Sequence, residues 1–237
     1  MPAARKIPIV CYVTERKSLD TSGAAPNVLV KIRAAIAAGV DWVQIREKDL
    51  PARELLELTR AAIRIAAEDA GARVAREVAT DAVPLGVRIL VNDRLDAALA
   101  AGAAGVHLGS DSIPAREVAR WLREGNAPPH FSLGVSCHSL EEVRAAQDAG
   151  ATYAFFGPVF DSPAKRSFGS PQGIARLEEV CNSVKIPVLA IGGVNEENAE
   201  RCLRAGAAGI AAIRLFQQKD PVEGDLREKI SRLHKIS

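Results

Sequence analysis

Hydrophobic and polar positions recur along the chain in one order: a short apolar run, a turn, and a longer stretch with helical spacing. Val28, Ile32 and Ala35 illustrate the spacing of three and four residues that buries one face of a helix. The apolar runs predict eight strands, near residues 7–14, 40–46, 88–92, 105–109, 131–136, 153–159, 187–192 and 209–214. Strand and helix therefore alternate from one end of the chain to the other.

A repeated phrase supports this alternation. The stretches "AAGVDWVQI", "AAGAAGVHL", "DAGATYAFF" and "RAGAAGIAA" begin at residues 37, 100, 148 and 204. In each, an alanine-rich helical run stops at a glycine suited to the left-handed position after a helix, and a β-rich run follows. Strands this apolar have no face left for water, so they need a parallel sheet covered by helices. Eight such units in about 250 residues favour an α/β fold, a single-domain (β/α)8 TIM barrel spanning residues 1–237.

Composition narrows the function classes. The 31 basic and 29 acidic residues nearly cancel, which argues against wholesale binding of nucleic acid or of an acidic membrane. The longest apolar runs are broken by glycine and are shorter than the roughly 20 residues of a membrane helix. The four cysteines have no C-x-x-C spacing and no secretory segment precedes the first strand, so we expect free thiols in a reducing cytoplasm. The expected partners are small molecules, and the sequence leaves open whether the chain forms a homo-oligomer.

Two connections are longer than a barrel requires. Residues 68–88 predict an extended second helix followed by a surface excursion at the bottom of the barrel, to which the sequence assigns no role. The loop that follows the sixth strand, near residues 161–172, is rich in Gly, Pro and Ser, and it has the composition of a lid or of a disordered surface loop. The sequence does not say whether this loop is ordered without ligand.

Charge gathers at the end of the second strand, in "VQIREKDL". Parallel strands of a barrel all deliver their carboxyl ends to one face, where active sites form. Arg46 and Lys48 are two residues apart, so an extended chain points both to the same side. Two cations there suit a diphosphate. The alternative is solvated loop charge neutralised by Glu47 and Asp49.

The third and fifth strands also end in polar residues. Asn92 and Asp93 could hold a hard cation or an amino-heterocycle, or they could cap the next helix. Ser136 and His138 follow the fifth strand. A histidine at a barrel mouth can act as an acid or base, although a lone histidine is more often a hydrogen-bonded structural residue.

The seventh and eighth strands end in a pattern that suits phosphate. Gly192 and Gly193 follow the seventh strand, and Ile213 and Arg214 end the eighth. Backbone amides at these two strand ends are the usual phosphate cradle of such barrels. Glycines after a strand are also ordinary turn formers, so the pair alone does not decide between the two interpretations.

Several ordered motifs together resemble a known family. The segments "VQIREKDL", "VNDRLDAALAAGAAGVHLG", "LGVSCHSLEEV", "FFGPVFDSPAKR" and "IPVLAIGGVNEENAERCLRAGAAGIAA" are similar to the thiamine-phosphate synthase and thiazole tautomerase superfamily of TIM barrels, from about residue 8 to 216. The resemblance implies a transferase that joins hydroxymethylpyrimidine diphosphate to thiazole phosphate and releases pyrophosphate.

The resemblance also implies roles for individual residues. Arg46, Lys48 and Lys165 would meet the charge that grows on the leaving group, and Asp93 would bind Mg²⁺. The pyrimidine diphosphate would be held by Gln44, Arg46, Lys48, Asn92, Ser136 and Lys165, and the thiazole phosphate by Ser162, Gly192, Gly193, Ile213 and Arg214.

One departure keeps other functions open. After the fourth strand the synthases have Gln and, two residues on, a metal-binding Asp, whereas this chain has Ser110, Asp111 and Ser112. Asp111 could take over as the second metal ligand through a shift of one residue or through water. The two serines look more like the metal-independent tautomerases, in which His138 would be the acid or base. A non-catalytic protein that binds thiamine precursors is the third alternative. The retained "QIREK" and "ND" favour the synthase, because a tautomerase has no diphosphate to bind.

Overall fold

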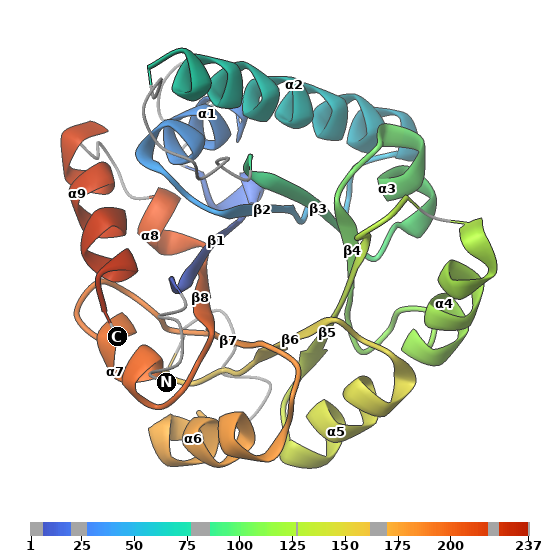
Figure 1. Cartoon of the computed structure of the whole chain (residues 1–237), viewed down its shortest axis with the longest axis vertical. Coiled ribbons are helices and arrows are strands. Elements are labelled where there is room, and N and C mark those ends of the chain that lie inside the picture. Colours follow the sequence, from blue (N-terminus) through green and yellow to red (C-terminus); the bar gives the residue numbers. More distant parts are fainter. Residues whose placement is uncertain are drawn as a thin grey trace.

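The eight predicted strands form a closed parallel barrel. The computed structural model describes residues 7–19, 28–76, 86–126, 128–161, 170–217 and 223–236. Each strand pairs in parallel with the next, and the last pairs with the first (Figure 1). The strands are β1 (Ile9–Val13), β2 (Trp42–Ile45), β3 (Arg88–Asn92), β4 (Gly105–Leu108), β5 (Ser132–Cys137), β6 (Tyr153–Phe156), β7 (Val188–Ile191) and β8 (Gly209–Ala212). The predicted (β/α)8 barrel is confirmed.

Helices form the outer layer around this barrel (Figure 1). They are α1 (Val28–Ala38), α2 (Ala52–Arg76), α3 (Leu95–Ala101), α4 (Ala115–Trp121), α5 (Leu140–Ala149), α6 (Gly173–Ser183), α7 (Ala199–Arg204), α8 (Arg214–Gln217) and α9 (Glu223–His234). Two shorter helical turns are Arg16–Ser18 and Leu122–Asn126. The predicted extension of the second helix is confirmed, since α2 runs for 25 residues. The predicted surface excursion falls largely on residues 77–85, outside the described residues.

Alternation along each strand separates two apolar layers. One set of side chains fills the barrel interior, namely Cys11, Val13, Leu90, Tyr153, Phe155, Leu189 and Ala211. The alternate positions, such as Val10 and Tyr12 on β1, pack outward against the helices. Successive strand residues point to opposite faces, so both faces are buried without a break in the apolar run. The four cysteines are free thiols.

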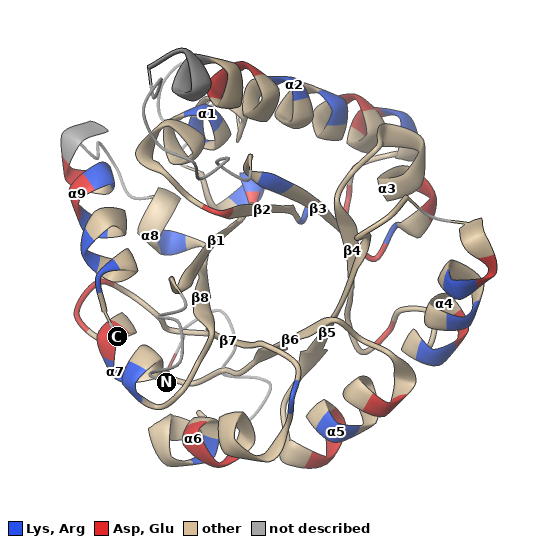
Figure 2. Ribbon diagram, in the orientation of Figure 1, with Lys and Arg blue, Asp and Glu red and all other residues tan. Residues whose placement is uncertain are grey.

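Glycine and charge mark the boundaries of these layers. Gly102 and Gly150 end α3 and α5 in the left-handed conformation, with φ of 74° and 99°, as the repeated phrase predicts. Charged residues lie mainly on the outer helices and again where the chain leaves β1 and β2 (Figure 2). Among the described residues, no helix is both long enough and apolar enough to cross a membrane.

Candidate active site

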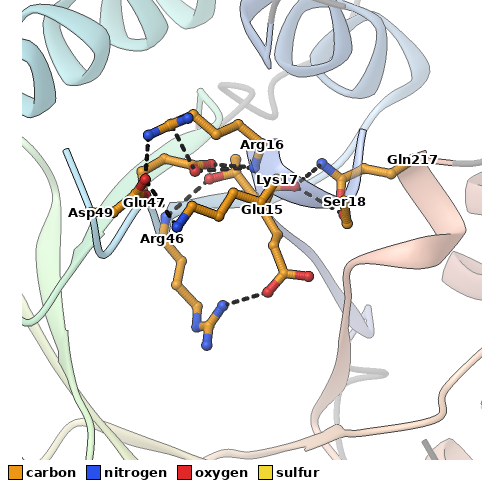
Figure 3. Close-up of polar contacts among 9 residues, drawn as sticks. Glu15, Arg16, Lys17, Ser18, Arg46, Glu47, Asp49 and Gln217 are labelled. Atoms are coloured by element: carbon orange, nitrogen blue, oxygen red, sulfur yellow. Dashed lines mark hydrogen bonds and ion pairs between the residues drawn. The ribbon is translucent and has the colours of Figure 1, made fainter. Parts of the chain in front are cut away.

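The segments that follow β1 and β2 bring opposite charges together (Figure 3). Arg46 Nη1 lies 3.0 Å from Glu15 Oε1. Asp49 Oδ2 lies 2.5 Å from Arg16 Nη2 and 3.2 Å from Lys17 Nζ. The charge in "VQIREKDL" is therefore matched by charge in the segment after β1, and within the described residues Arg46 pairs with Glu15. Neither carboxylate that the alternative interpretation offered pairs with it.

Glu47, which follows β2, also connects the ends of β1 and β2 through hydrogen bonds. Its side chain is buried, and its two carboxylate oxygens each accept a hydrogen bond of 3.0 Å from the backbone N–H of Arg16. Burial raises the pKa of Glu47, although hydrogen bonds from Thr14 and Arg16 oppose this. The backbone N–H of Arg46 donates to Thr14 Oγ1 at 3.0 Å. The strand ends are thereby held in register, and the side chains of Arg46 and Glu15 reach toward the centre of the barrel mouth (Figure 3).

A chain of amide and carboxylate groups links the carboxyl ends of β2 and β3. Gln44 Nε2 donates to Asn92 Oδ1 at 3.0 Å, and Asn92 Nδ2 donates to Asp93 Oδ2 at 2.7 Å. The other oxygen of Asp93 accepts from the backbone N–H of Gly109 at 3.2 Å and from the hydroxyl of Ser112. Three of the predicted site residues therefore meet. The alternative helix-cap role is wrong, because α3 has no side-chain cap.

The donor chemistry around Asp93 fits a magnesium ion with a single protein carboxylate. Mg²⁺ binds oxygen ligands and commonly takes one or two carboxylates together with phosphate oxygens and water. Asp111 is exposed, and it is the neighbouring Ser112 that contacts Asp93. The described part of the chain contains no group of three His, Cys, Asp or Glu side chains that could hold a metal. The predicted role of Asp111 stays a prediction, and a bound ion would depend on Asp93 and the substrate.

Gln44 carries an unsatisfied acceptor. Its side chain is 1% exposed, and its Oε1 has no hydrogen-bond partner among the described residues. A buried polar atom without a partner is costly unless a ligand or water satisfies it. Gln44 Oε1 is therefore suited to accept a hydrogen bond from a ligand that enters the mouth.

His107, on β4, is a site residue that sequence reasoning missed. It is 1% exposed, its Nε2 lies 2.8 Å from Ser136 Oγ, and its Nδ1 lies 3.1 Å from the hydroxyl of Tyr153. The available signal was a polar residue inside the apolar strand "GVHL". Position 107 alternates with outward-facing Val106 and Leu108, so it points into the barrel. His107 connects Ser136, at the mouth, to the barrel interior.

His138 holds the neighbouring β6 loop. Its Nδ1 is hydrogen bonded to the carbonyl oxygen of Gly157. A carbonyl only accepts, so Nδ1 carries the proton. The backbone N–H of His138 donates to the carboxylate of Glu142 at 2.6 Å. These contacts give His138 a structural role, and its predicted acid or base role stays a prediction.

The glycines after β7 allow the loop after β6 to approach closely. Gly192 and Gly193 have φ of 90° and 67°. A Cβ on Gly193 would lie 2.6 Å from the carbonyl oxygen of Asp161, and a Cβ on Gly192 would lie 2.5 Å from Pro158 Cα. Residues with side chains would clash at both positions. The predicted contact with a phosphate is untested by this geometry.

The remaining predicted residues fall into two groups. Ile213 packs, partly buried, against the interior cluster, and Arg214 is exposed at the first position of α8. Lys48 is exposed after β2. Ser162 and Lys165 lie outside the described residues, as does most of the loop at 161–172, and their predicted roles stay predictions.

Comparisons with known proteins agree with this arrangement. The family model described as "Thiamine monophosphate synthase" matches residues 10–216. A protein of Geobacter sulfurreducens, "Putative thiamine-phosphate synthase", is 43% identical over 198 residues, 83% of each chain. The "Thiamine-phosphate synthase" of Roseiflexus sp. is 40% identical over 206 residues, 86% of this chain and 76% of that one.

A solved structure gives the same result. The thiamine phosphate pyrophosphorylase from Pyrococcus furiosus superposes with a TM-score of 0.74 and 29% sequence identity, covering 95% of this chain and 96% of that one. The match spans the strands that carry Gln44, Arg46, Asn92 and Asp93. The chain belongs to the thiamine monophosphate synthase family.

Proposed function

We propose that this protein is a thiamine-phosphate synthase, which joins hydroxymethylpyrimidine diphosphate to thiazole phosphate and releases pyrophosphate. One structural observation carries the proposal: Gln44, Asn92 and Asp93 form a connected polar row at the carboxyl ends of β2 and β3, and Arg46 directly follows β2 at the same face of the barrel. A pyrimidine with an amino group and a diphosphate needs both parts of that site. The family relationship supports the same reaction.

Different residues are proposed to bind the pyrimidine ring and the diphosphate of the first substrate. The free acceptor Gln44 Oε1 suits the amino group of the pyrimidine, since a buried acceptor is satisfied there by an N–H donor. Arg46 offers a planar fork to phosphate oxygens, and Lys48 adds a point charge. Asn92 and Ser136 complete the proposed diphosphate site, with Lys165 as a further proposed cation.

The reaction follows from charge stabilisation and proximity. The C–O bond to the diphosphate ionises, and the ring carries the positive charge that remains. Arg46 and Lys48 stabilise the negative charge that develops on the leaving group. A Mg²⁺ ion on Asp93 would supply further neutralisation of that charge. The thiazole nitrogen, held close by, then captures the cation.

The second substrate is proposed to bind at the same mouth of the barrel, at the carboxyl ends of the seventh and eighth strands. Its phosphate would contact Ser162 and the backbone near Gly192, Gly193, Ile213 and Arg214. Backbone amides at the ends of the seventh and eighth strands suit a monophosphate. We place the reaction in the cytoplasm, which fits free cysteines and small phosphorylated substrates.

The test is a turnover assay on the purified protein. Both substrates and Mg²⁺ are supplied, and pyrophosphate and thiamine phosphate are quantified together. The proposal predicts that the two products appear in equal amounts and that each requires both substrates. Absence of pyrophosphate would contradict it. Interconversion of thiazole phosphate tautomers in the presence of a chelator, without pyrophosphate release, would identify a tautomerase instead.

A further inference from the structure

A row of hydrogen-bonding side chains crosses three strands below the proposed diphosphate site. Tyr153 of β6 contacts His107 of β4 at 3.1 Å, and His107 contacts Ser136 of β5 at 2.8 Å. Tyr153 and His107 are each 1% exposed, whereas Ser136 is half-buried. The row therefore begins in the barrel interior and ends at the mouth.

The row depends on the absence of a side chain at Gly134. Strands β4 and β6 are not neighbours, because β5 lies between them. A Cβ on Gly134 would lie 2.3 Å from the hydroxyl oxygen of Tyr153 and 2.6 Å from Nδ1 of His107. No other residue type leaves this space open. Gly134 thus permits side chains from two separated strands to meet across the inner face of β5.

The hydrogen-bond partners of His107 determine which of its ring nitrogens carries the proton. Burial raises the pKa of Tyr153 well above its ordinary value, so its O–H stays protonated. Within the described part of the chain, the hydrogen-bond partner of this hydroxyl is Nδ1 of His107. A buried donor without an acceptor costs more than an oxygen with a spare lone pair. Tyr153 therefore donates to Nδ1.

The second nitrogen then has a fixed role. A neutral imidazole has one acceptor nitrogen and one donor nitrogen. The ring of His107 packs 4.3 Å, between centroids, from Phe155, and a buried charge in such surroundings would lose its hydration. With Nδ1 as the acceptor, Nε2 carries the proton and donates to Ser136 Oγ.

We propose that Tyr153 and His107 are positioning residues that turn the Ser136 hydroxyl into a hydrogen-bond donor toward the substrate diphosphate. Because Nε2–H occupies a lone pair of Ser136 Oγ, the hydrogen of the serine is left to point into the mouth. In the opposite tautomer Nε2 would take that hydrogen, and the serine would present lone pairs to an anion. The inference rests on the proposed function only in naming the diphosphate as the anion.

The first test measures the tautomer and needs no turnover. Protein labelled with ¹⁵N at histidine is examined by NMR, and His107→Gln assigns the resonances among the four histidines. We expect a protonated Nε2 and an unprotonated Nδ1 for His107 in the wild type. In Tyr153→Phe, Nδ1 loses the donor that favours the Nε2–H form, so the population of that form should fall. A proton on Nδ1 in the wild type would overturn the inference.

The second test measures binding of inorganic pyrophosphate by calorimetry, in the four proteins of a double-mutant cycle. Tyr153→Phe should weaken binding by about fivefold, the effect of one hydrogen bond of about 1 kcal/mol. The same change in a Ser136→Ala background should have no further effect, since the serine that relays it is gone. Equal effects in both backgrounds would mean that Tyr153 acts only on packing and would overturn the inference.

Two further variants keep the result interpretable. Tyr12→Phe removes a buried tyrosine hydroxyl on β1 that faces the helix layer, so pyrophosphate affinity should not change. His107→Gln retains an N–H donor near Ser136 and should bind better than His107→Leu. Loss of synthase turnover in the wild type would refute the proposed function while leaving the tautomer and pyrophosphate results to stand by themselves.

Discussion

The barrel interior is polar on one side and apolar on the other. On strands β2 to β5, the inward positions near the mouth carry Gln44, Asn92, His107 and Ser136, which are linked to one another or to Asp93 and Tyr153. On strands β7, β8 and β1, the inward positions carry Leu189, Ala211, Cys11 and Val13. Both sides are built from parallel strands, but Asn92 and Ser136 are only partly buried on the polar side, whereas all four apolar residues are buried.

This difference separates the residues that stabilise the barrel from those that can bind a ligand. The apolar side gains from removal of its surface from water, an effect that does not depend on direction. The polar side must satisfy each buried donor and acceptor, so its side chains are fixed by their partners. Where one atom stays unsatisfied, as at Gln44 Oε1, a ligand has something to complete.

The largest expected effect comes from substitutions that destabilise the polar side or the apolar side of the barrel and are then compared for pyrophosphate binding. Gly134→Ala forces the ring of Tyr153 to move and should lower the free energy of unfolding by about 3 kcal/mol, a Tm decrease of roughly 6–12 °C. Leu189→Ala leaves a cavity of similar cost, about 2–5 kcal/mol. Thermal unfolding and pyrophosphate calorimetry are compared for both variants. Only Gly134→Ala should lose affinity, and equal affinity losses would remove the distinction.

A control for that comparison is Gly71→Ala on α2. An added Cβ at Gly71 meets nothing within 4 Å. Alanine favours the helix over glycine by up to about 1 kcal/mol, so this variant should unfold at the wild-type temperature or above it.

The second prediction concerns the charge at the polar side. Arg46→Ala should reduce kcat/KM for thiamine phosphate formation by about a hundredfold, because one donor to a developing oxyanion is removed. Its control is Arg33→Ala, which breaks an exposed ion pair between α1 and α2 and should leave turnover unchanged. Rates are measured by pyrophosphate release. Near-wild-type turnover of the Arg46 variant would show that the polar side does not hold the leaving group.

The third prediction concerns the ion pair already present in the mouth. Glu15 lies 3.0 Å from Arg46, and a diphosphate must compete with it for the guanidinium. Half-exposed pairs of this kind contribute about 0–1 kcal/mol. Glu15→Gln should therefore strengthen pyrophosphate binding by up to about fivefold. Weaker binding in calorimetry would show that Glu15 orients Arg46 for the ligand.

The smallest expected effect is a pH dependence of stability. Burial raises the pKa of Glu47 above its unfolded value, so the folded protein binds the proton more tightly. The resulting stabilisation is fully present below the unfolded pKa and is lost as the pH rises through the folded pKa. Glu47→Gln should remove this part of the decline, as measured by denaturant unfolding from about pH 4 upward. An unchanged slope would assign the pH dependence to other groups.

Much of this could be predicted from the sequence, because strand parity and helix-ending glycines are local signals. They located the eight strands and placed Gln44, Asn92 and Ser136 at the mouth. Contacts between strands that are not neighbours could not be predicted from the sequence. The hydrogen bond between Tyr153 and His107, for example, depends on the absence of a side chain at Gly134. The pairing of Glu15 with Arg46 joins residues that are 31 positions apart and follow neighbouring strands, and local patterns do not show which charges meet across such a separation.

The contact of Ser112 with Asp93 lies beyond local patterns as well. Asp93 adopts a left-handed backbone with φ of 61°, which few residues other than glycine, asparagine and aspartate tolerate. This conformation lets the carboxylate accept hydrogen bonds from the loop after β4. Sequence spacing pointed to Asp111 instead, because spacing does not give the conformation of the loop after β4.

The most direct test of the account is a kinetic comparison of Asn92→Leu with the wild type, with each substrate varied in turn. The substitution keeps the size of the side chain and breaks the row between Gln44 and Asp93. We predict that KM for the pyrimidine diphosphate rises about tenfold or more, the effect of leaving buried polar groups without partners, while KM for the thiazole phosphate changes little. Equal changes in both constants, or a change confined to the thiazole phosphate, would contradict the assignment of the diphosphate to the polar side of the barrel.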